Sequence, residues 1–313
     1  MSKYHFSMIL SESNLFKSIP MYVSLLKNCS DFKLFILCMN DSVYYMLNKI
    51  GFENIIAIQL KDLEINNPDL SIAKSNRTFH EYCWTLKPIF LKYIMDNFSG
   101  AEYYAHLDAD LFFFSNVDPI FNEDPDASII LINHRNSKEF EHYYELSGLY
   151  NTGFVGLKNN DEAKIAMKLW IERCVKKCTI EYDTINKTFG DQRYVEDWPQ
   201  IFKNVHIVNS IGANVAFWNV KSYKISKNND IVYVNNSSLI FYHFSSVVIL
   251  GPKEFDLCSF YYIDDKNLIK YVYDPYIRYL SNSIYNIINE FPWFDKGFVD
   301  KVNILNLHNY KIQ

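Results

Sequence analysis

Glycine is scarce in this sequence. Nine of the 313 residues are glycine, about 3%, where about 7% is usual. No two of them are separated by a single residue, so the G-x-G-x-x-G turn that binds dinucleotides is absent. Gly148 and Gly153 are five residues apart but are followed by Phe-Val instead of Lys-Ser/Thr, which rules out a P-loop. Any phosphate that this chain binds must be held by something other than a glycine-rich backbone loop.

Cysteine pairs, an excess of basic residues and long apolar runs are also missing. No C-x-x-C pair occurs, and Cys174 and Cys178 have no His or Cys at metal-ligand spacing, so they are better explained as reduced side chains on a helix face. Thirty-one basic against 36 acidic residues give a formal charge of −5, which provides no basic field for nucleic acid. No apolar run approaches the ~18 residues of a transmembrane helix, and the N-terminus does not resemble a signal peptide. We expect a soluble, cytoplasmic protein that binds no nucleic acid.

The hydrophobic residues are arranged in short runs. They make up 49% of the chain, and aromatic residues 17%, which is enough to bury a core and excludes a disordered chain. Buried strands are expected at residues 4–10, 32–38, 55–60 and 103–107. Helices are expected at residues 15–26, after the capping segment at residues 40–42 up to Gly51, and from Thr85, with Pro88 in the first turn, to Ser99; residues 61–80 show no clear period. Strands that alternate with helices in this way predict βαβ units and a largely parallel sheet.

After residue 110 the order of the elements becomes mixed. Strands are expected at residues 128–132, 153–157, 205–208, 231–234 and 239–242. Asp161 is expected to cap a helix that ends at Cys178, and the Tyr-rich C-terminal part is expected to be helical from Asp265 to Glu290. The sequence therefore predicts one mixed α/β domain with a helical C-terminal cap.

Two aspartates separated by one residue follow the strand at 103–107. Ligands of open α/β sheets bind outside the carboxyl ends of the strands, and two carboxylates can share a divalent cation that screens a diphosphate. Chance alone gives about one D-x-D in a chain of this composition, and Asp124 and Asp126 form a second one, in a polar turn where solvated acids are expected. Asp108 and Asp110 stand instead between YYAHL and LFFF, where a carboxylate is costly to bury unless it is paired or metal-bound. They are therefore the candidate metal ligands.

The segment around this pair carries a resemblance to a known family. YYAHLDADLFFFSNVDPIF resembles the D-x-D region of GT-A fold glycosyltransferases, which transfer sugars from nucleotide diphosphates, and is most similar to glycogenin and the retaining transferases of family 8. Further segments match in the same order: LSESNLFKSIPMYVSLL, WTLKPIFLKYIM, YNTGFVGLKN, FGDQRYVEDWPQIF and IFYHFS. Over most of the chain, the resemblance is closer still to bacterial transferases encoded with surface-polysaccharide genes, whose FGDQ, DWP, GAN and WN motifs recur here.

The resemblance implies the site residue by residue. The donor would be bound by Ser11, Lys87, Asp108, Asp110, Asn151, Thr152 and Gly153. His243 would complete a metal site with Asp108 and Asp110 for a divalent cation, with Mn²⁺ favoured over Mg²⁺. Asp191 and Gln192 are the candidate catalytic residues. The acceptor would be bound by His134, Trp198, Asn214 and Trp218.

The resemblance also implies how the chain is divided. Residues 1–255 would form the GT-A domain, with a donor half of about 1–115 and an acceptor half of about 116–255. Residues 256–313 would form a helical extension packed on it. The Tyr-rich helices of this extension admit three roles: a cap on the acceptor side, a homodimer contact, or a peripheral contact with the inner face of the membrane. If the acceptor is lipid-linked, Trp293 and Phe294 are the residues to test for lipid binding.

Several of these residues also have a purely structural explanation. Lys87 can be a helix-surface lysine, Asp191 an N-cap, and His243 a structural strand histidine; Trp198 and Trp218 can be core residues. The sequence also departs from the family at two places. Leu15 stands where the family has an aromatic residue that stacks on the base, and Gly251 and Lys253 lie far beyond the spacing of the late H-x-x-G-x-x-K pattern.

The expected reaction is transfer of a hexose-type sugar from a UDP-sugar to a glycan, lipid-linked or protein acceptor, in bacterial surface-polysaccharide or glycoconjugate synthesis. Retention, with the leaving phosphate as base, is favoured over inversion, for which Asp191, Glu196 and Asp197 would be the candidate bases. The alternative is a degenerate transferase that serves as a carbohydrate-binding or scaffold subunit, which Leu15 supports. A sugar nucleotidyltransferase would need a glycine-rich loop, and a haloacid dehalogenase-type phosphatase a Thr or Ser soon after the second aspartate; the sequence has neither.

Overall fold

The computed structural model describes residues 2–65, 67–304 and 307–312. The chain forms two compact units, and each is assembled from separate stretches of the sequence. Unit 1 consists of Met1–Leu10, Asp31–Asp108 and Asp118–Asn209. Unit 2 consists of Ser11–Ser30, Ala109–Val117 and Ser210–Gln313. Residues 256–313 thus cluster with earlier stretches of the chain, and the division expected at residue 255 stays a prediction.

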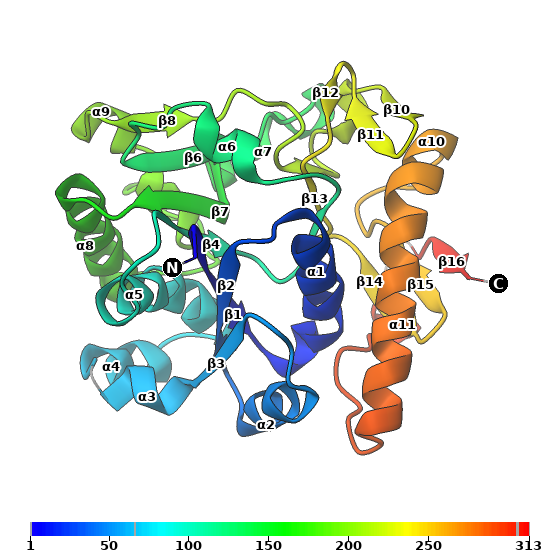
Figure 1. Cartoon of the computed structure of the whole chain (residues 1–313), viewed down its shortest axis with the longest axis horizontal. Coiled ribbons are helices and arrows are strands. Elements are labelled where there is room, and N and C mark those ends of the chain that lie inside the picture. The colour runs from blue at the N-terminus through cyan, green and yellow to red at the C-terminus, as the bar shows by residue number, and fades with distance from the viewer. Residues whose placement is uncertain (1, 66, 305–306, 313) are drawn as a thin grey trace. The chain divides into compact units, whose positions relative to one another are not determined.

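Unit 1 is built on a mixed, mostly parallel sheet. In its described part the sheet has seven strands in the order β3-β2-β1-β4-β7-β6-β8. Their bounds are β1 Tyr4–Leu10, β2 Phe32–Cys38, β3 Ile55–Gln59, β4 Tyr103–Leu107, β6 Ile129–Asn133, β7 Tyr150–Lys158 and β8 Val205–Ile207. Strand β7 runs antiparallel to both of its neighbours, β4 and β6, while the remaining pairs are parallel. This is the predicted α/β fold class (Figure 1).

Helices cover the sheet of unit 1. They are α2 Asp41–Ile50, α3 Leu60–Ile65, α4 Asp69–Ser75, α5 Phe79–Asn97, α6 Asp118–Asn122, α7 Tyr143–Ser147, α8 Asp161–Lys176 and α9 Trp198–Ile201. Short 3₁₀ turns lie at Lys138–Phe140 and Gln192–Val195. Helices α5 and α8 lie side by side on one face of the sheet (Figure 1), where Leu86, Phe90 and Trp170 join the buried core. Burial of these large side chains holds α5 against strands β1 and β4 of the sheet.

The beginning of α5 differs from the sequence prediction. The helix starts at Phe79, six residues before the expected Thr85, because Thr78 and Glu81 form a capping box. The Glu81 carboxylate accepts from the Thr78 backbone N–H at 2.7 Å, and Thr78 Oγ1 accepts from the Glu81 N–H at 3.4 Å. Pro88 consequently lies inside the helix and not in its first turn.

Two further local predictions were wrong. Residues 61–80 contain the short helices α3 and α4, which are too short and polar to produce a clear period. Helix α8 was expected to be capped by Asp161 and to end at Cys178. It spans Asp161–Lys176, and its cap is Asn160, whose side-chain oxygen accepts from the Ala163 N–H at 3.0 Å. The cap residue precedes the helix, so a capping position was assigned one residue too late.

Unit 2 combines long helices with small sheets. Its helices are α1 Leu15–Asn28, α10 Lys266–Leu268 and α11 Asp274–Glu290, with 3₁₀ turns at Glu12–Asn14, Val220–Ser222 and Lys301–Asn303 and a π-helical turn at Ile269–Tyr273. Its described strands pair in the orders β5-β13-β9, β10-β11-β12 and β14-β15-β16. They are β5 Leu111–Phe113, β9 Val215–Ala216, β10 Ile225–Asn228, β11 Ile231–Val234, β12 Ser237–Ser238, β13 Phe241–His243, β14 Val248–Gly251, β15 Glu254–Asp256 and β16 Asn309–Lys311.

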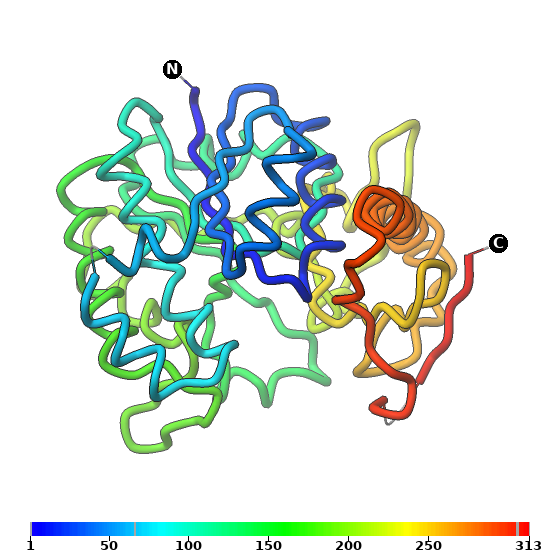
Figure 2. Tube along the Cα trace, turned by 90° about the horizontal axis from the view of Figure 1, so that it is seen from below, coloured from blue at the N-terminus to red at the C-terminus, as the bar shows by residue number. Residues whose placement is uncertain are grey.

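The C-terminal part is helical from Asp265 to Glu290, as predicted, and Asp265 caps its first turn. Figure 2 shows α11 and the chain that follows it, which returns to pair as β16 with β15. Phe294 is buried against Phe16 of α1, whereas Trp293 is 55% exposed. Of the two residues named for lipid binding, only Trp293 therefore has a solvent-exposed side chain. Among the described residues, no helix is both long enough and apolar enough to cross a membrane.

Candidate active site

A small pocket in unit 1 gathers most of the residues that the sequence singled out. Its volume is about 100 Å³. It is lined by Trp84, Lys87, Asp108, Asn151, Thr152, Gly153, Phe189, Gly190, Asp191 and Gln192. Seven of these ten are predicted site residues, from four stretches of the sequence: α5, the end of β4, β7 and the loop before Gln192. Their convergence depends on the tertiary fold, because the four stretches are spread between residues 84 and 192 of the sequence.

Strand pairing places the two polar sides of this pocket together. Strands β4 and β7 are antiparallel, with Leu107 opposite Phe154. One residue further on, the Asp108 N–H donates to the carbonyl of Gly153 at 2.9 Å. The acidic end of β4 is thereby fixed beside the Asn-Thr-Gly segment of β7. Gly153 donates its own N–H to Asn151 Oδ1 at 3.2 Å, which orients that amide.

Lys87 occupies the centre of the charged groups. The residue is 6% exposed, so it is not a helix-surface lysine. Its Nζ lies 2.9 Å from Asp108 Oδ1 and 3.8 Å from Asp191 Oδ2. A buried ammonium between two carboxylates compensates part of their mutual repulsion and of their desolvation.

Asp191 is held by its side chain and does not cap a helix with it. The residue occupies the N-cap position of the turn at Gln192–Val195 but makes no side-chain cap hydrogen bond. Instead, the Thr152 hydroxyl donates to Asp191 Oδ2 at 2.7 Å. Burial raises the pKa of Asp191, and the Lys87 charge and the Thr152 hydrogen bond oppose that rise. The Asp191 side chain therefore lines the pocket while it is buried and hydrogen-bonded to Thr152.

His106 was missed by the sequence analysis and lies directly behind Asp108. Its Nε2 is 3.1 Å from Asp108 Oδ1, and its Nδ1 is 3.1 Å from Ser7 Oγ of β1. Burial lowers the pKa of His106, while the hydrogen bond with Asp108 opposes this. A histidine in the otherwise apolar run before the aspartates was the one signal in the sequence that could have indicated it.

Two aromatic residues on the wall of the pocket were also missed. The rings of Trp84 and Phe189 lie with their centroids 6.1 Å apart. Gly190 has a φ of +54°, and a Cβ at this position would meet the Trp84 ring at 3.4 Å. A methyl group at residue 190 would thus lie in van der Waals contact with the tryptophan that lines the pocket, whereas the left-handed φ disfavours any side chain there.

The second aspartate belongs to unit 2, where it is paired with the late histidine. His243 Nε2 lies 3.0 Å from Asp110 Oδ1. Antiparallel pairing of β5 and β13 sets His243 opposite Leu111, and the Phe244 N–H donates to the carbonyl of Asp110 at 2.8 Å. Trp218 packs edge-on against the imidazole, with the ring centroids 5.4 Å apart.

Two residues of the first helical segment complete the description of unit 2. Burial lowers the pKa of Lys17 in α1, and the nearby Asp110 carboxylate opposes that shift, so this unpredicted lysine shares the environment of Asp110. Ser11, a predicted donor residue, is buried, and its hydroxyl lies 2.8 Å from that of Ser13. Neither the sequence pattern nor the motif indicated Lys17.

The four predicted acceptor residues occupy different environments. His134 in unit 1 is buried, with Nδ1 3.1 Å from the Gly148 carbonyl and Nε2 3.3 Å from Asn151 Nδ2. Trp198 has no exposed surface and packs edge-on against Trp170, which is the placement of a core residue. In unit 2, Trp218 packs edge-on against the imidazole of His243. Asn214 is buried in a left-handed conformation with a φ of 62°.

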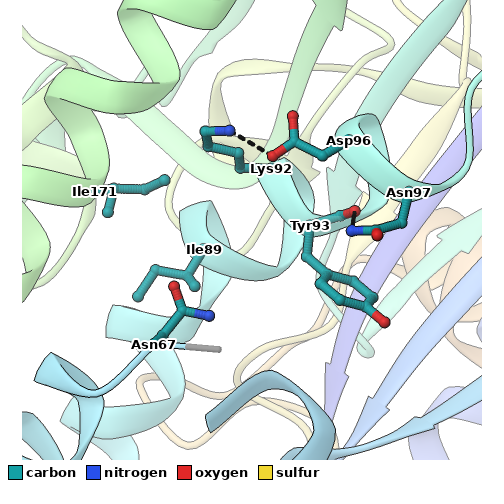
Figure 3. Close-up of a pocket in the computed structure, with 7 residues that line it drawn as sticks. All are labelled: Asn67, Ile89, Lys92, Tyr93, Asp96, Asn97 and Ile171. Carbon is teal, nitrogen blue, oxygen red and sulfur yellow. Dashed lines mark hydrogen bonds and ion pairs between the residues drawn. The ribbon is translucent and has the colours of Figure 1, made fainter. Parts of the chain in front are cut away.

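A larger pocket of unit 1 contains none of the predicted residues. Its volume is about 300 Å³, and it is lined by Asn67, Ile89, Lys92, Tyr93, Asp96, Asn97 and Ile171. Figure 3 shows that its polar groups are engaged locally: Lys92 pairs with Asp96, and the Asn97 amide donates to the Tyr93 carbonyl at 2.8 Å. We therefore assign the candidate site to the smaller pocket, which holds the converging carboxylates and the buried lysine.

Comparison with known structures defines the class of fold. The galactosyltransferase LgtC, solved in complex with donor and acceptor sugar analogs, has a TM-score of 0.54 over 89% of this chain and 95% of its own, with 11% sequence identity. An active-site mutant of LgtC has a TM-score of 0.52 over the same shares, with 12% identity. The chain has the GT-A fold of nucleotide-sugar glycosyltransferases, as the sequence predicted.

Sequence comparison identifies the relatives. No family model matches the chain. YfnD, an uncharacterized protein of Bacillus subtilis (strain 168), is 48% identical over 308 residues, which cover 98% of each chain. YfnF from the same organism, also uncharacterized, is 32% identical over 253 residues, which cover 79% of this chain and 82% of YfnF. The chain belongs to the protein family of YfnD and YfnF.

Proposed function

We propose that this protein is a metal-dependent glycosyltransferase that moves a hexose-type sugar from a UDP-sugar to a glycan, lipid-linked or protein acceptor in bacterial surface-polysaccharide or glycoconjugate synthesis. The observation that carries the proposal is the convergence of seven predicted residues on one pocket of a GT-A fold. Membership of family 8 stays a prediction. The solved LgtC structure with donor and acceptor sugar analogs supports the reaction class by analogy of fold alone.

The pocket suits the charged part of a nucleotide-sugar. Lys87 is the one cation among its lining residues, and it is buried where its interaction with a diphosphate would be weakly screened. Asn151, Thr152 and Gln192 offer hydroxyl and amide groups that hydrogen-bond sugar hydroxyls. Trp84 and Phe189 provide the apolar wall against which a sugar ring can pack. These features replace the glycine-rich loop that the sequence lacks.

Two carboxylates and an imidazole form a ligand set that suits a divalent cation. We propose Asp108, Asp110 and His243 as its ligands. Two neighbouring ligands of an octahedral ion with bonds of about 2.1 Å are about 3 Å apart, and Asp110 Oδ1 and His243 Nε2 are separated by 3.0 Å. Asp108 is joined to Asp110 through Ala109 alone, so the chain keeps both carboxylates within reach. The nitrogen ligand favours Mn²⁺ over Mg²⁺, which prefers oxygen. Such a cation stabilises the negative charge of a departing diphosphate.

Two of the three candidate general bases for inversion are engaged away from the pocket. Asp197 is engaged by both guanidinium nitrogens of Arg173 at 2.7 Å, and Glu196 Oε2 accepts from the Leu149 N–H at 2.9 Å. Neither residue lines the pocket. With Asp108 assigned to the cation, Asp191 and Gln192 remain to contact the transferred sugar. In the retaining reaction that the resemblance favours, these two residues contact the sugar and the leaving phosphate is the base for the acceptor hydroxyl; in an inverting reaction Asp191 would be the base.

Asn214 is the strongest acceptor candidate. Both polar atoms of its amide are buried and have no hydrogen-bond partner among the described residues. Its left-handed backbone conformation is uncommon for a residue other than glycine. An unsatisfied buried amide costs about 1–3 kcal/mol, and a sugar hydroxyl would satisfy it. Asn214, Trp218 and His134 therefore remain proposed acceptor residues, whereas the buried position of Trp198 supports its alternative, a core role.

One observation favours the alternative of a carbohydrate-binding or scaffold subunit. Leu15, at the position of the expected base-stacking residue, is fully buried and presents no surface to a base. The Asp110–His243 pair and the Lys87 cluster favour an enzyme, because a scaffold has no need of a charged, buried pocket. The homodimer and the peripheral membrane contact through the C-terminal helices are further proposals, and exposed Trp293 is where a membrane contact would begin.

A donor screen tests the proposal. UDP-, GDP- and CDP-sugars are incubated with the protein and Mn²⁺, and nucleotide release and binding are measured. We expect release of UDP that EDTA abolishes and that Asp110→Ala lacks. Asp124→Ala is the matched control, because Asp124 belongs to the second D-x-D and lies in the polar turn. Metal-independent glycan binding without nucleotide affinity would support the scaffold instead, and a preference for GDP or CDP donors would contradict the family 8 analogy.

A further inference from the structure

We infer that His106 is a positioning residue that, together with Ser7, fixes the orientation of the Asp108 carboxylate. The inference rests on the proposed function, because it concerns a proposed ligand of the cation. All three residues belong to unit 1, so the arrangement is internal to one compact unit. His106 has no contact with the space of the pocket and acts through Asp108.

The three side chains form a continuous hydrogen-bonded row. Parallel pairing of β1 with β4 places Ser7 directly beside His106. Ser7 Oγ lies 3.1 Å from His106 Nδ1, and His106 Nε2 lies 3.1 Å from Asp108 Oδ1. Ser7 and His106 are both fully buried. The row therefore begins inside the sheet and ends at the edge where the pocket opens.

The donors and acceptors of the row can be assigned from its chemistry. A carboxylate accepts hydrogen bonds only, so His106 must donate from Nε2 to Asp108. In a neutral imidazole the other nitrogen, Nδ1, is then an acceptor, and the Ser7 hydroxyl donates to it. Asp108 thus fixes the tautomer that carries the hydrogen on Nε2, and the Ser7 hydroxyl satisfies Nδ1 and holds the ring in place. A polar row of this kind would be costly if any member were left unsatisfied.

Asp108 Oδ1 accepts from two hydrogen-bond donors, Lys87 and His106, and only Lys87 also has other negatively charged groups within its reach. Lys87 Nζ lies 2.9 Å from this oxygen but is also 3.8 Å from Asp191, and in the proposed function it attracts the diphosphate as well. His106 uses both of its ring nitrogens in the row. When Lys87 turns to a bound diphosphate, His106 is the donor that continues to hold the carboxylate. Loss of such support from a ligand typically costs 10- to 100-fold in metal affinity.

A second buried histidine of the same sheet provides the control. His5 of β1 is 4% exposed, and its Nδ1 lies 3.0 Å from the Phe98 carbonyl, remote from Asp108. If His106 only satisfies the core, its replacement should resemble that of His5. If it positions Asp108, its replacement should change metal binding in addition to stability.

The test measures Mn²⁺ binding by the full chain with electron paramagnetic resonance, together with thermal unfolding and the kcat and KM of nucleotide release. We expect His106→Leu to raise the Kd for Mn²⁺ by about 10- to 100-fold, and Ser7→Ala to raise it by less. His106→Gln should restore most of the affinity, because its amide nitrogen can replace Nε2–H. His5→Leu should lower the unfolding temperature without changing the Kd for Mn²⁺.

The outcomes separate this inference from the proposed function. A wild-type Kd for Mn²⁺ in His106→Gln, Ser7→Ala and His106→Leu would overturn the positioning role alone. Should His106→Leu fail to fold, the comparison of Ser7→Ala and His106→Gln with wild type still decides, since a positioning role requires Ser7→Ala to bind Mn²⁺ more weakly. A wild-type protein that binds no Mn²⁺ would overturn the proposed metal site, and this inference with it.

Discussion

The imidazole Nε2 of His243 lies 3.0 Å from Oδ1 of Asp110, although the two residues are 133 positions apart in the sequence. Only the pairing of β5 with β13 brings them together. A second histidine–carboxylate pair, His206 with Glu123, has the same kind of geometry at 2.9 Å but belongs to unit 1, at the edge strand β8. The two pairs allow a direct comparison of a proposed ligand with a structural histidine–carboxylate hydrogen bond.

Replacement of His243 by alanine should weaken Mn²⁺ binding and nucleotide release, each by at least about tenfold. The reason is that a three-residue ligand set would lose its nitrogen. Isothermal titration with Mn²⁺ and a nucleotide-release assay measure the two effects. His206→Ala serves as the control and should leave both quantities unchanged. Equal behaviour of the two variants would contradict a ligand role for His243.

Replacement of Gly190 by alanine should reduce both stability and activity. The left-handed φ of +54° costs an alanine about 1–2 kcal/mol, and the new Cβ would add a methyl group to the pocket lining, in contact with the Trp84 ring at 3.4 Å. Gly51→Ala is the matched control, because Gly51 has a φ of +69° with no atom within 4 Å of the added Cβ. We expect similar losses in the free energy of unfolding but a loss of UDP-sugar turnover in Gly190→Ala alone. Normal turnover in Gly190→Ala would contradict a substrate position beside residue 190 and the Trp84 ring.

Acid should loosen the C-terminal strand. Hydrogen bonds from Lys301 and Asn309 lower the pKa of Glu254 from 4.5 to about 2. A carboxylate with a lowered pKa stabilises the folded state above its unfolded pKa, and this contribution is lost as the pH falls from about 4.5 towards 2. Amide hydrogen exchange of Asn309–Lys311, corrected for its intrinsic pH dependence, should therefore accelerate as the pH falls from about 4.5 towards 2. In Glu254→Gln the exchange should be fast throughout and nearly independent of pH; an unchanged wild-type rate would contradict the role of Glu254.

Local signals explain what the sequence predicted of the fold. The strands Phe32–Cys38 and Tyr103–Leu107 were predicted with their observed bounds, because each is a short apolar run that ends in polar residues. Helices α3 and α4 were missed because six- and seven-residue polar helices do not repeat often enough to show a period. The start of α5 was misplaced although its capping box, Thr78 and Glu81, was present in the sequence.

The site shows the same division between local and distant signals. Asp108, Asp191 and Asn151 could be named because each stands in a short motif. Trp84 and Lys17 could not, because a tryptophan and a lysine in amphipathic helices have an ordinary structural explanation. The row from Ser7 to His106 joins residues 99 positions apart, and only the register of β1 against β4 reveals it.

Removal of the Lys87 charge should affect donor binding more than folding. Lys87→Met keeps the length of the side chain but leaves the Asp108 and Asp191 carboxylates without their shared cation. Loss of a preorganised charge at a developing negative charge typically costs about 10²- to 10³-fold in rate, so kcat/KM for the UDP-sugar should fall by about that factor. The pKa of Asp191, already raised by burial, should rise further, so the remaining activity should shift to higher pH.

Lys92→Met on the same helix is the control for Lys87→Met. Lys92 pairs with Asp96 at the surface, where an ion pair contributes about 0–1 kcal/mol to stability. This variant should keep the wild-type kcat/KM and pH profile. Lys87→Arg should recover part of the rate, because the positive charge is retained while its geometry changes. Wild-type kinetics in Lys87→Met would contradict the assignment of the diphosphate to this pocket, since no other lining residue carries a positive charge.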